Sequence, residues 1–215
     1  MARNKYPEET VEKILTAAAR LFLEKGYEQT TIQDIVDNLG GLTKGAVYHH
    51  FKSKAEIMDA LCDRMFHEGN PFEKVRERGD LNGLEKMKEV VRLTQEPEWA
   101  SLGSQSMGIL KDPHMLAKSL EDSRKLVVPR WLELIEEGMA DGSIRTEYPQ
   151  EAAELLSLLD TLWMNPAIFP ATREGVLRKF HCAMEIFAHL GVPVIDDEMI
   201  ALADKFFQMV PPELM

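Results

Sequence analysis

Apolar residues recur at three- and four-residue steps along almost the whole chain, and no segment alternates apolar and polar residues as a strand does. This spacing gathers apolar side chains on one face of an α-helix. Glycine or proline marks most of the gaps between such segments. The sequence therefore predicts an all-α protein, with helices over residues 8–25, 31–39, 43–49, 53–68, 81–95, 99–110, 113–140, 149–164, 171–190 and 196–210.

Two prolines qualify this pattern. Pro129 lies inside the segment 113–140, and because proline lacks an amide hydrogen, a kink or break is expected there. Gly69, Asn70 and Pro71 end the fourth segment, and no helix is predicted between them and residue 81.

The charge of the chain is unevenly distributed. The net charge is −11, yet residues 1–60 contain eight basic and nine acidic side chains, so that the remaining residues carry almost all of the negative charge. Binding to phosphates needs Lys and Arg. Only this nearly neutral N-terminal region is therefore expected to approach nucleic acid.

No apolar run has the length of a membrane helix, and the N-terminus lacks an apolar export signal. We therefore expect no membrane contact and a cytoplasmic location.

The first part of the chain has the pattern of a helix-turn-helix. Gly40 and Gly41 separate two short helical segments, and glycine freely takes the positive φ angles of a tight turn. A longer helix precedes them, and in this motif the second short helix enters the major groove. We predict a DNA-binding domain over residues 1–52 and a helical regulatory and dimerisation domain over 53–215, linked by the helix 53–68.

The segment 43–49 has little apolar content beyond Val47, so most of it is predicted to contact a polar partner. Lysine bonds naturally to guanine acceptors, and methyl groups pack on the thymine methyl. Base edges are therefore expected to be contacted by Thr43, Lys44, Ala46 and His49, while Gly45 lets the backbone approach DNA. The start of the next helix, with Lys54, and Thr31 at the start of the preceding short helix favour phosphate binding.

Two runs between Ile14 and Leu61, ILTAAARLFLEKGYEQTTIQDIV and TKGAVYHHFKSKAEIMDAL, resemble the signature of the TetR family of regulators. The resemblance covers about the first 60 residues. It implies a homodimer of all-helical subunits, usually a repressor, with a ligand pocket in the C-terminal domain and a dimer face made by the late helices.

The resemblance also implies roles for single residues. The positions that commonly face DNA are matched by Thr31, Thr43, Lys44, Gly45, Tyr48, His49 and Lys54, with Tyr48 and Lys54 on phosphates. His50 and Phe51 more often support the fold. The stretch from Asp34 to Gly45 is one residue longer than the usual spacing, which leaves the register of the recognition helix open.

The C-terminal region offers candidates for an effector pocket and for a dimer face. Soft and aromatic side chains build adaptable pockets between bundle helices, and the pocket candidates are Trp99, Met107, Trp131, Trp163 and Met184. Two late segments have broad apolar faces that are expected to pair across a two-fold axis as a four-helix bundle. The dimer candidates are Leu155, Leu158, Leu159, Leu162, Val176, Phe180, Ala183 and Phe187.

Other chemistries have weaker support. Adjacent His49 and His50 point in different directions on a helix, so no metal site is predicted. The run Gly103–Gly108 lacks the G-x-S-x-G spacing of a hydrolase elbow. We predict no catalytic residue and no cofactor.

The predicted function is a transcriptional regulator released from a palindromic operator by a small-molecule effector. A ligand-independent or activating regulator and a helical small-molecule-binding enzyme are the alternatives.

Overall fold

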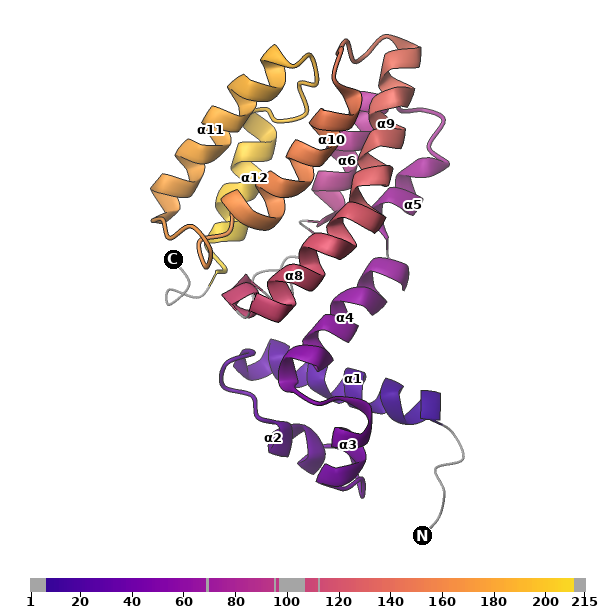
Figure 1. Cartoon of the computed structure of the whole chain (residues 1–215), viewed down its shortest axis with the longest axis vertical. Helices are drawn as coiled ribbons and strands as arrows, with labels where there is room; N and C mark the ends of the chain where they lie inside the picture. The colour runs from indigo at the N-terminus through magenta and orange to yellow at the C-terminus, as the bar shows by residue number, and fades with distance from the viewer. Residues whose placement is uncertain (1–6, 69, 95, 97–106, 112, 211–215) are drawn as a thin grey trace. The chain divides into compact units, whose positions relative to one another are not determined.

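The computed structural model describes residues 7–68, 70–94, 96, 107–111 and 113–210, and every regular element in these residues is a helix (Figure 1). The all-α prediction is confirmed. Within the same residues no helix combines the length and apolarity needed to cross a membrane. The chain divides into two compact units, residues 1–68 and 69–215.

The N-terminal unit consists of four helices, α1 (Pro7–Lys25), α2 (Ile32–Asp37), α3 (Lys44–His50) and α4 (Lys54–Glu68). Their apolar faces meet in one core, whose fully buried side chains include Ile14, Phe22, Ile35, Val47 and Ile57. Helix α4 packs against α1. For this reason the unit ends after residue 68 and contains α4, in contrast to the predicted domain boundary after residue 52.

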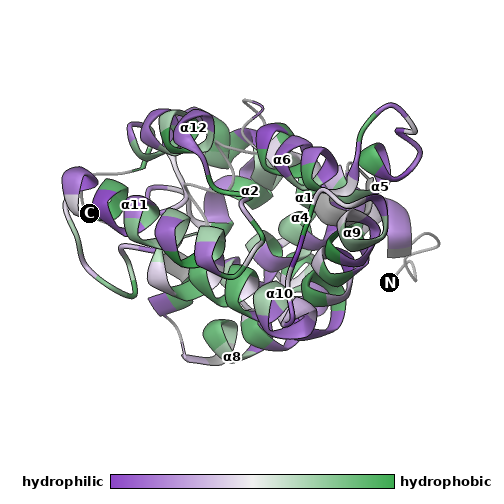
Figure 2. Cartoon of the chain, turned by 90° about the horizontal axis from the view of Figure 1, so that it is seen from above, coloured by the Kyte–Doolittle hydropathy of each residue, from purple (hydrophilic) through white to green (hydrophobic). Residues whose placement is uncertain are grey.

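The C-terminal unit contains more helices than the N-terminal unit in the described part of the chain, and its labelled α-helices carry both hydrophilic and hydrophobic residues (Figure 2). Helix α9 packs against both α6 and α10, and α11 packs against α12. In chain order the elements are α5 (Pro71–Arg76), α6 (Gly83–Thr94), the 3-10 helix η1 (Met107–Lys111), α8 (Pro113–Asp122), the π-helix η2 (Ser123–Val127), α9 (Val128–Asp141), α10 (Pro149–Leu158), the π-helix η3 (Leu159–Trp163), α11 (Arg173–His189) and α12 (Asp197–Phe207).

Gly83 allows α6 to approach α9 closely, and Gly138 of α9 leaves room for the Ile144 side chain. A Cβ atom added at Gly83 would lie 2.2 Å from the backbone nitrogen of Gly138, and one added at Gly138 would lie 2.6 Å from the Ile144 side chain. The Gly83 amide also donates to the Asp141 carboxylate over 2.7 Å. Contact between backbones therefore fixes this helix pair, and any larger side chain would separate the helices.

The structure shows how the chain continues at both prolines. Pro129 does not break the long segment; the π-helix η2 precedes it and α9 starts at Val128. Because proline lacks an amide hydrogen, one helical carbonyl has no usual donor, and a π-turn is one way to continue the helix past it.

Pro71 begins helix α5, which was not predicted, with Asn70 as its N-cap. Proline suits the first turn, where amide hydrogens have no helical partner.

Candidate DNA-binding surface

The start of α2 is fixed by a reciprocal cap. The Asp34 amide donates to Thr31 Oγ1 over 3.1 Å, and the Thr31 amide donates to Asp34 Oδ2 over 2.7 Å, so the two residues form a capping box. The Thr31 hydroxyl also donates to Asp34 Oδ2. Hydrogen bonds from the Thr31 side chain and then from Lys25 hold the pKa of the Asp34 carboxyl well below its usual value. The carboxylate is therefore ionised in the folded unit at neutral pH.

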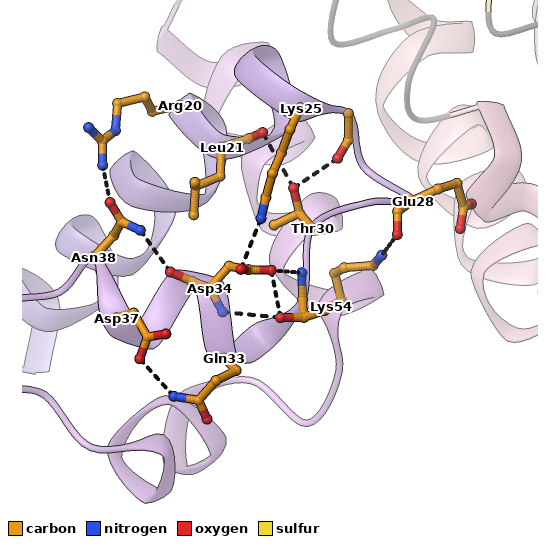
Figure 3. Close-up of polar contacts among 12 residues, drawn as sticks. Arg20, Leu21, Lys25, Glu28, Thr30, Gln33, Asp34, Asp37, Asn38 and Lys54 are labelled. Carbon is orange, nitrogen blue, oxygen red and sulfur yellow. Dashed lines mark hydrogen bonds and ion pairs between the residues drawn. The ribbon is translucent and has the colours of Figure 1, made fainter.

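Further polar contacts attach α2 to α1 (Figure 3). Lys25 Nζ lies 2.9 Å from Asp34 Oδ1, and Arg20 donates to the Asn38 side chain just after α2. The buried Thr30 hydroxyl lies within hydrogen-bonding distance of the Gly26 carbonyl, at 2.8 Å, in the loop between the helices. These contacts hold α2 in one orientation, and α2 in turn supports α3, against which it packs.

The turn between α2 and α3 depends on two consecutive glycines. Gly40 has φ +57° and Gly41 has φ +112°, and such angles are unfavourable for residues that carry a Cβ atom. Thr43 follows in an extended conformation and is the N-cap of α3, its Oγ1 accepting from the Ala46 amide over 3.3 Å. Helix α3 starts at Lys44, one residue later than the predicted start of the recognition helix.

Helix α3 has one apolar side and one open polar side. Val47 is fully buried and Ala46 is half-buried, so Ala46 has less surface available to a base than predicted. Lys44, Gly45 and His49 are exposed. Residues one turn apart on a helix share a face, so this exposed set forms a continuous strip.

Tyr48 belongs to the same strip. The residue is 45% exposed, which is high for a large aromatic residue, and Lys44 Nζ lies 6.0 Å from the centroid of its ring. The strip therefore combines a cation, a phenol, an imidazole and an exposed backbone segment. This combination is suited to phosphate and base-edge contacts in a DNA groove.

Lys54 has a different environment from the one predicted. Its ammonium group donates to the carbonyls of Tyr27 and Glu28, at 2.7 and 3.3 Å, and lies 4.1 Å from the centroid of the Tyr27 ring (Figure 3). Its side chain is half-buried, and desolvation lowers the pKa of the ammonium. Lys54 therefore joins the start of α4 to the loop after α1. Two of the three N–H donors of its ammonium group bond to these carbonyls, so a phosphate would have to accept from the third.

The start of α4 is capped beside Lys54. Ser53 Oγ accepts from the Glu56 amide over 3.1 Å, as the S-x-x-E pattern predicts. The Glu56 carboxylate accepts from the Lys52 amide rather than from Ser53. Of the residues expected to support the fold, Phe51 is buried and is the C-cap of α3, while His50 is half-buried.

The pocket candidates in the described residues have different neighbours. Trp131 packs edge-on against Phe72 of α5, with ring centroids 4.7 Å apart. Met107 packs instead against the core between α11 and α12. Trp163 lies in η3 and its carbonyl accepts from Lys179 over 2.7 Å. Met184 is half-buried on α11, and Trp99 lies outside the described residues.

The dimer candidates separate into two groups. Val176, Ala183 and Phe187 have no exposed surface in the subunit, so they belong to its core and have no surface for a second subunit to contact. The core around Val176 includes residues of α12. The other candidates keep accessible surface: Leu158 is 46% exposed, and the half-buried members are Leu155, Leu159, Leu162 and Phe180.

Comparison with known proteins extends these observations. Residues 14–61 match the family model described as bacterial regulatory proteins, tetR family. The HTH-type transcriptional repressor KstR2 of Rhodococcus jostii is 29% identical over 158 residues, which cover 71% of this chain and 76% of that protein. The HTH-type transcriptional regulator TtgR of Pseudomonas putida is 38% identical over 73 residues, 34% of each chain.

The fold is also found among solved structures. A transcriptional regulator from Cytophaga hutchinsonii superposes with a TM-score of 0.61 over 94% of this chain and 95% of that one, at 17% sequence identity. At this level of sequence identity the superposition shows a shared fold only, and the superposed residues include both units. The sequence match is strongest in the N-terminal unit, the part that carries the exposed strip on α3.

Proposed function

We propose that this chain is a repressor of the TetR family of bacterial regulatory proteins. Its dimer binds a palindromic operator and leaves the operator when a small-molecule effector binds. The exposed strip of α3 carries this proposal. Lys44, Tyr48 and His49 are the side chains that enter the major groove, and Thr43 and Thr31 lie at the helix starts that face phosphates.

The dimer is proposed to form through α10, η3 and α11. Leu155, Leu158 and Leu162 follow one another at three- and four-residue spacing along α10 and η3, on the side away from the buried Ala153 and Ser157. Ile186, which is 39% exposed on α11, is a further candidate that the sequence prediction missed. An isologous pairing of these apolar surfaces gives a two-fold axis, and a palindromic operator follows from that symmetry.

The effector is proposed to act from the C-terminal unit. Release requires that the effector bind the DNA-competent and the DNA-incompetent conformation with different affinities. We also propose that the chain acts by binding and not by catalysis, and that it acts in the cytoplasm, where bacterial DNA is located.

The test compares two tyrosines of similar exposure. Tyr48 is 45% exposed on α3, and Tyr148 is 51% exposed in the C-terminal unit. Fluorescence anisotropy with an operator duplex selected from random sequences measures the affinity of Tyr48→Ala and of the control Tyr148→Ala. We expect Tyr48→Ala to weaken binding by roughly tenfold or more, the cost of one charge-assisted contact. Tyr148→Ala should bind like the wild type.

Two results would contradict the proposal. If Tyr48→Ala binds the operator as tightly as the wild type, while its circular dichroism and molar mass are unchanged, α3 is not the recognition helix. If both tyrosine variants lose affinity equally, the effect does not come from the α3 strip.

A further inference from the structure

Lys54, in the first turn of α4, reaches back to the loop between α1 and α2 (Figure 3). Its Nζ donates to the carbonyl oxygens of Tyr27 and Glu28 and lies 4.1 Å from the centroid of the Tyr27 ring. An ammonium group has three N–H donors, and an aromatic face attracts a cation at this distance. A phosphate oxygen would therefore have to compete with the ring for the remaining donor.

The electrostatics beside Lys54 also disfavour a phosphate. Desolvation lowers the pKa of the Lys54 ammonium, and the Glu28 carboxylate acts on it in the opposite direction. A carboxylate of the protein thus already interacts with this ammonium, and it would repel an approaching phosphate. Lys54 is half-buried, whereas Lys52, two residues earlier, is exposed.

The ring that Lys54 faces is anchored in the core of the N-terminal unit. Tyr27 packs edge-on against Phe22 of α1, with ring centroids 5.3 Å apart, and Phe22 is fully buried. Aromatic pairs in this geometry stabilise a fold beyond the area that they bury. Lys54 therefore joins the start of α4 to a loop residue that α1 already holds in place.

The loop that Lys54 holds leads directly into α2. The Tyr27 carbonyl, which accepts from Lys54, also accepts from the Thr30 amide over 3.2 Å. Thr30 is buried, and the next residue, Thr31, is the N-cap of α2. One carbonyl thus links the first turn of α4 to the residue before the α2 cap. Because α2 packs against α3, the position of this loop also affects the exposed strip of α3.

We propose that Lys54 is a positioning residue for operator recognition, which fixes the start of α2, and through α2 the strip of α3, without contacting a phosphate itself. This inference rests on the proposed function, because it assigns to Lys54 a part in reading the operator. It replaces the phosphate contact that the sequence predicted for Lys54.

A phosphate contact and a positioning contact have different consequences for DNA binding. Attraction to phosphates depends on charge and salt and acts on every duplex, whereas the reading of base edges needs side chains in a defined position. Loss of a phosphate contact should therefore weaken binding to all duplexes. Loss of a positioning contact should weaken binding to the operator alone.

The test measures binding to the selected operator duplex and to a duplex of unrelated sequence, by fluorescence anisotropy at several salt concentrations. Lys54→Met removes the charge and the hydrogen bonds and keeps an unbranched side chain. Lys52→Met, the matched control, removes the same charge from the exposed neighbour. Lys54→Gln, which is shorter and uncharged, is a second variant in case Lys54→Met does not fold, and the same pattern is expected of it.

We expect Lys54→Met to lower the ratio of operator affinity to nonspecific affinity by roughly tenfold or more, the discrimination that one good base contact provides. Its nonspecific affinity, and the slope of log affinity against log salt concentration, should match those of the wild type. Lys52→Met should keep the wild-type ratio, because loss of a charge alone weakens binding to both duplexes alike.

Circular dichroism and molar mass first establish that each variant is folded and dimeric. A wild-type ratio in Lys54→Met, a salt slope flattened by about one per subunit as for a lost phosphate contact, or an equal loss of the ratio in Lys52→Met would overturn the inference. These results would leave the repressor itself intact. A folded wild type that does not prefer the operator to the unrelated duplex refutes the repressor, and this inference with it.

Discussion

At the residue scale, the cap at α2 shows which contacts a sequence reveals. The pairing of Thr31 with Asp34 was predictable because both belong to one turn of helix and their spacing is a known signal. The contacts of Asp34 with Lys25, and of Lys54 with the Tyr27 carbonyl, join separate helices. They depend on the angles between helices, which local spacing does not contain, and so the role of Lys54 in the fold was not predicted.

Asp34 leads to a prediction about pH. Its pKa is lower in the folded unit than the ordinary value of 3.8, so its ionised form stabilises the fold. This stabilisation is present above pH 3.8 and is lost as the pH falls toward the lower folded pKa. We expect Asp34→Asn to melt below the wild type at pH 7, and the difference in Tm to shrink as the pH falls below 3.8.

The control is Asp37→Asn, which removes the same charge from the end of the same helix, where Asp37 accepts from Gln33. Thermal melting followed by circular dichroism between pH 3 and 7 measures each difference. A difference for Asp34→Asn that does not change with pH, or an equal effect of Asp37→Asn, would refute the assigned role.

At the scale of elements, helical periodicity predicted most helices of the described residues, but not how they pack. Helix α5 was missed because Pro71 was interpreted as a break, although Asn70 and Pro71 also form a helix start. The apolar stripe of α11 was assigned to a dimer face because periodicity identifies a buried face without showing what covers it. In the structure α12 covers part of that stripe, including Val176.

The crossing of α6 and α9 leads to a second prediction. Because a Cβ atom at Gly83 would lie 2.2 Å from the backbone of Gly138, Gly83→Ala forces the helices apart. We expect the free energy of unfolding to fall by about 1–3 kcal/mol, the usual cost of overpacking. Urea denaturation measures this change.

Gly79→Ala is the matched control, because a Cβ atom there would meet nothing within 4 Å. Its stability should stay close to that of the wild type. If Gly83→Ala is as stable as the wild type, the helices do not meet through their backbones at this point.

At the scale of the whole molecule, the proposed binding to a palindromic operator requires a dimer. Leu158 is 46% exposed on the proposed face of α10, and Met139 is 41% exposed on α9, outside that face. A buried unpaired charge is costly, so Leu158→Glu should dissociate the dimer while Met139→Glu should not. Light scattering after size exclusion should give 24.4 kDa for the Leu158 variant and twice that mass for the control and the wild type. If the Leu158→Glu protein stays dimeric, the dimer interface does not lie on this face of α10.

The central claim is that a folded dimer recognises a specific DNA sequence, and the most direct measurement is selection from a pool of random duplexes. The purified protein retains its preferred DNA, and the retained fraction is sequenced. We expect a palindromic consensus whose half-sites lie about one turn of the DNA helix, or a multiple of it, apart. No enrichment at low salt, from protein shown to be folded and dimeric, would contradict it.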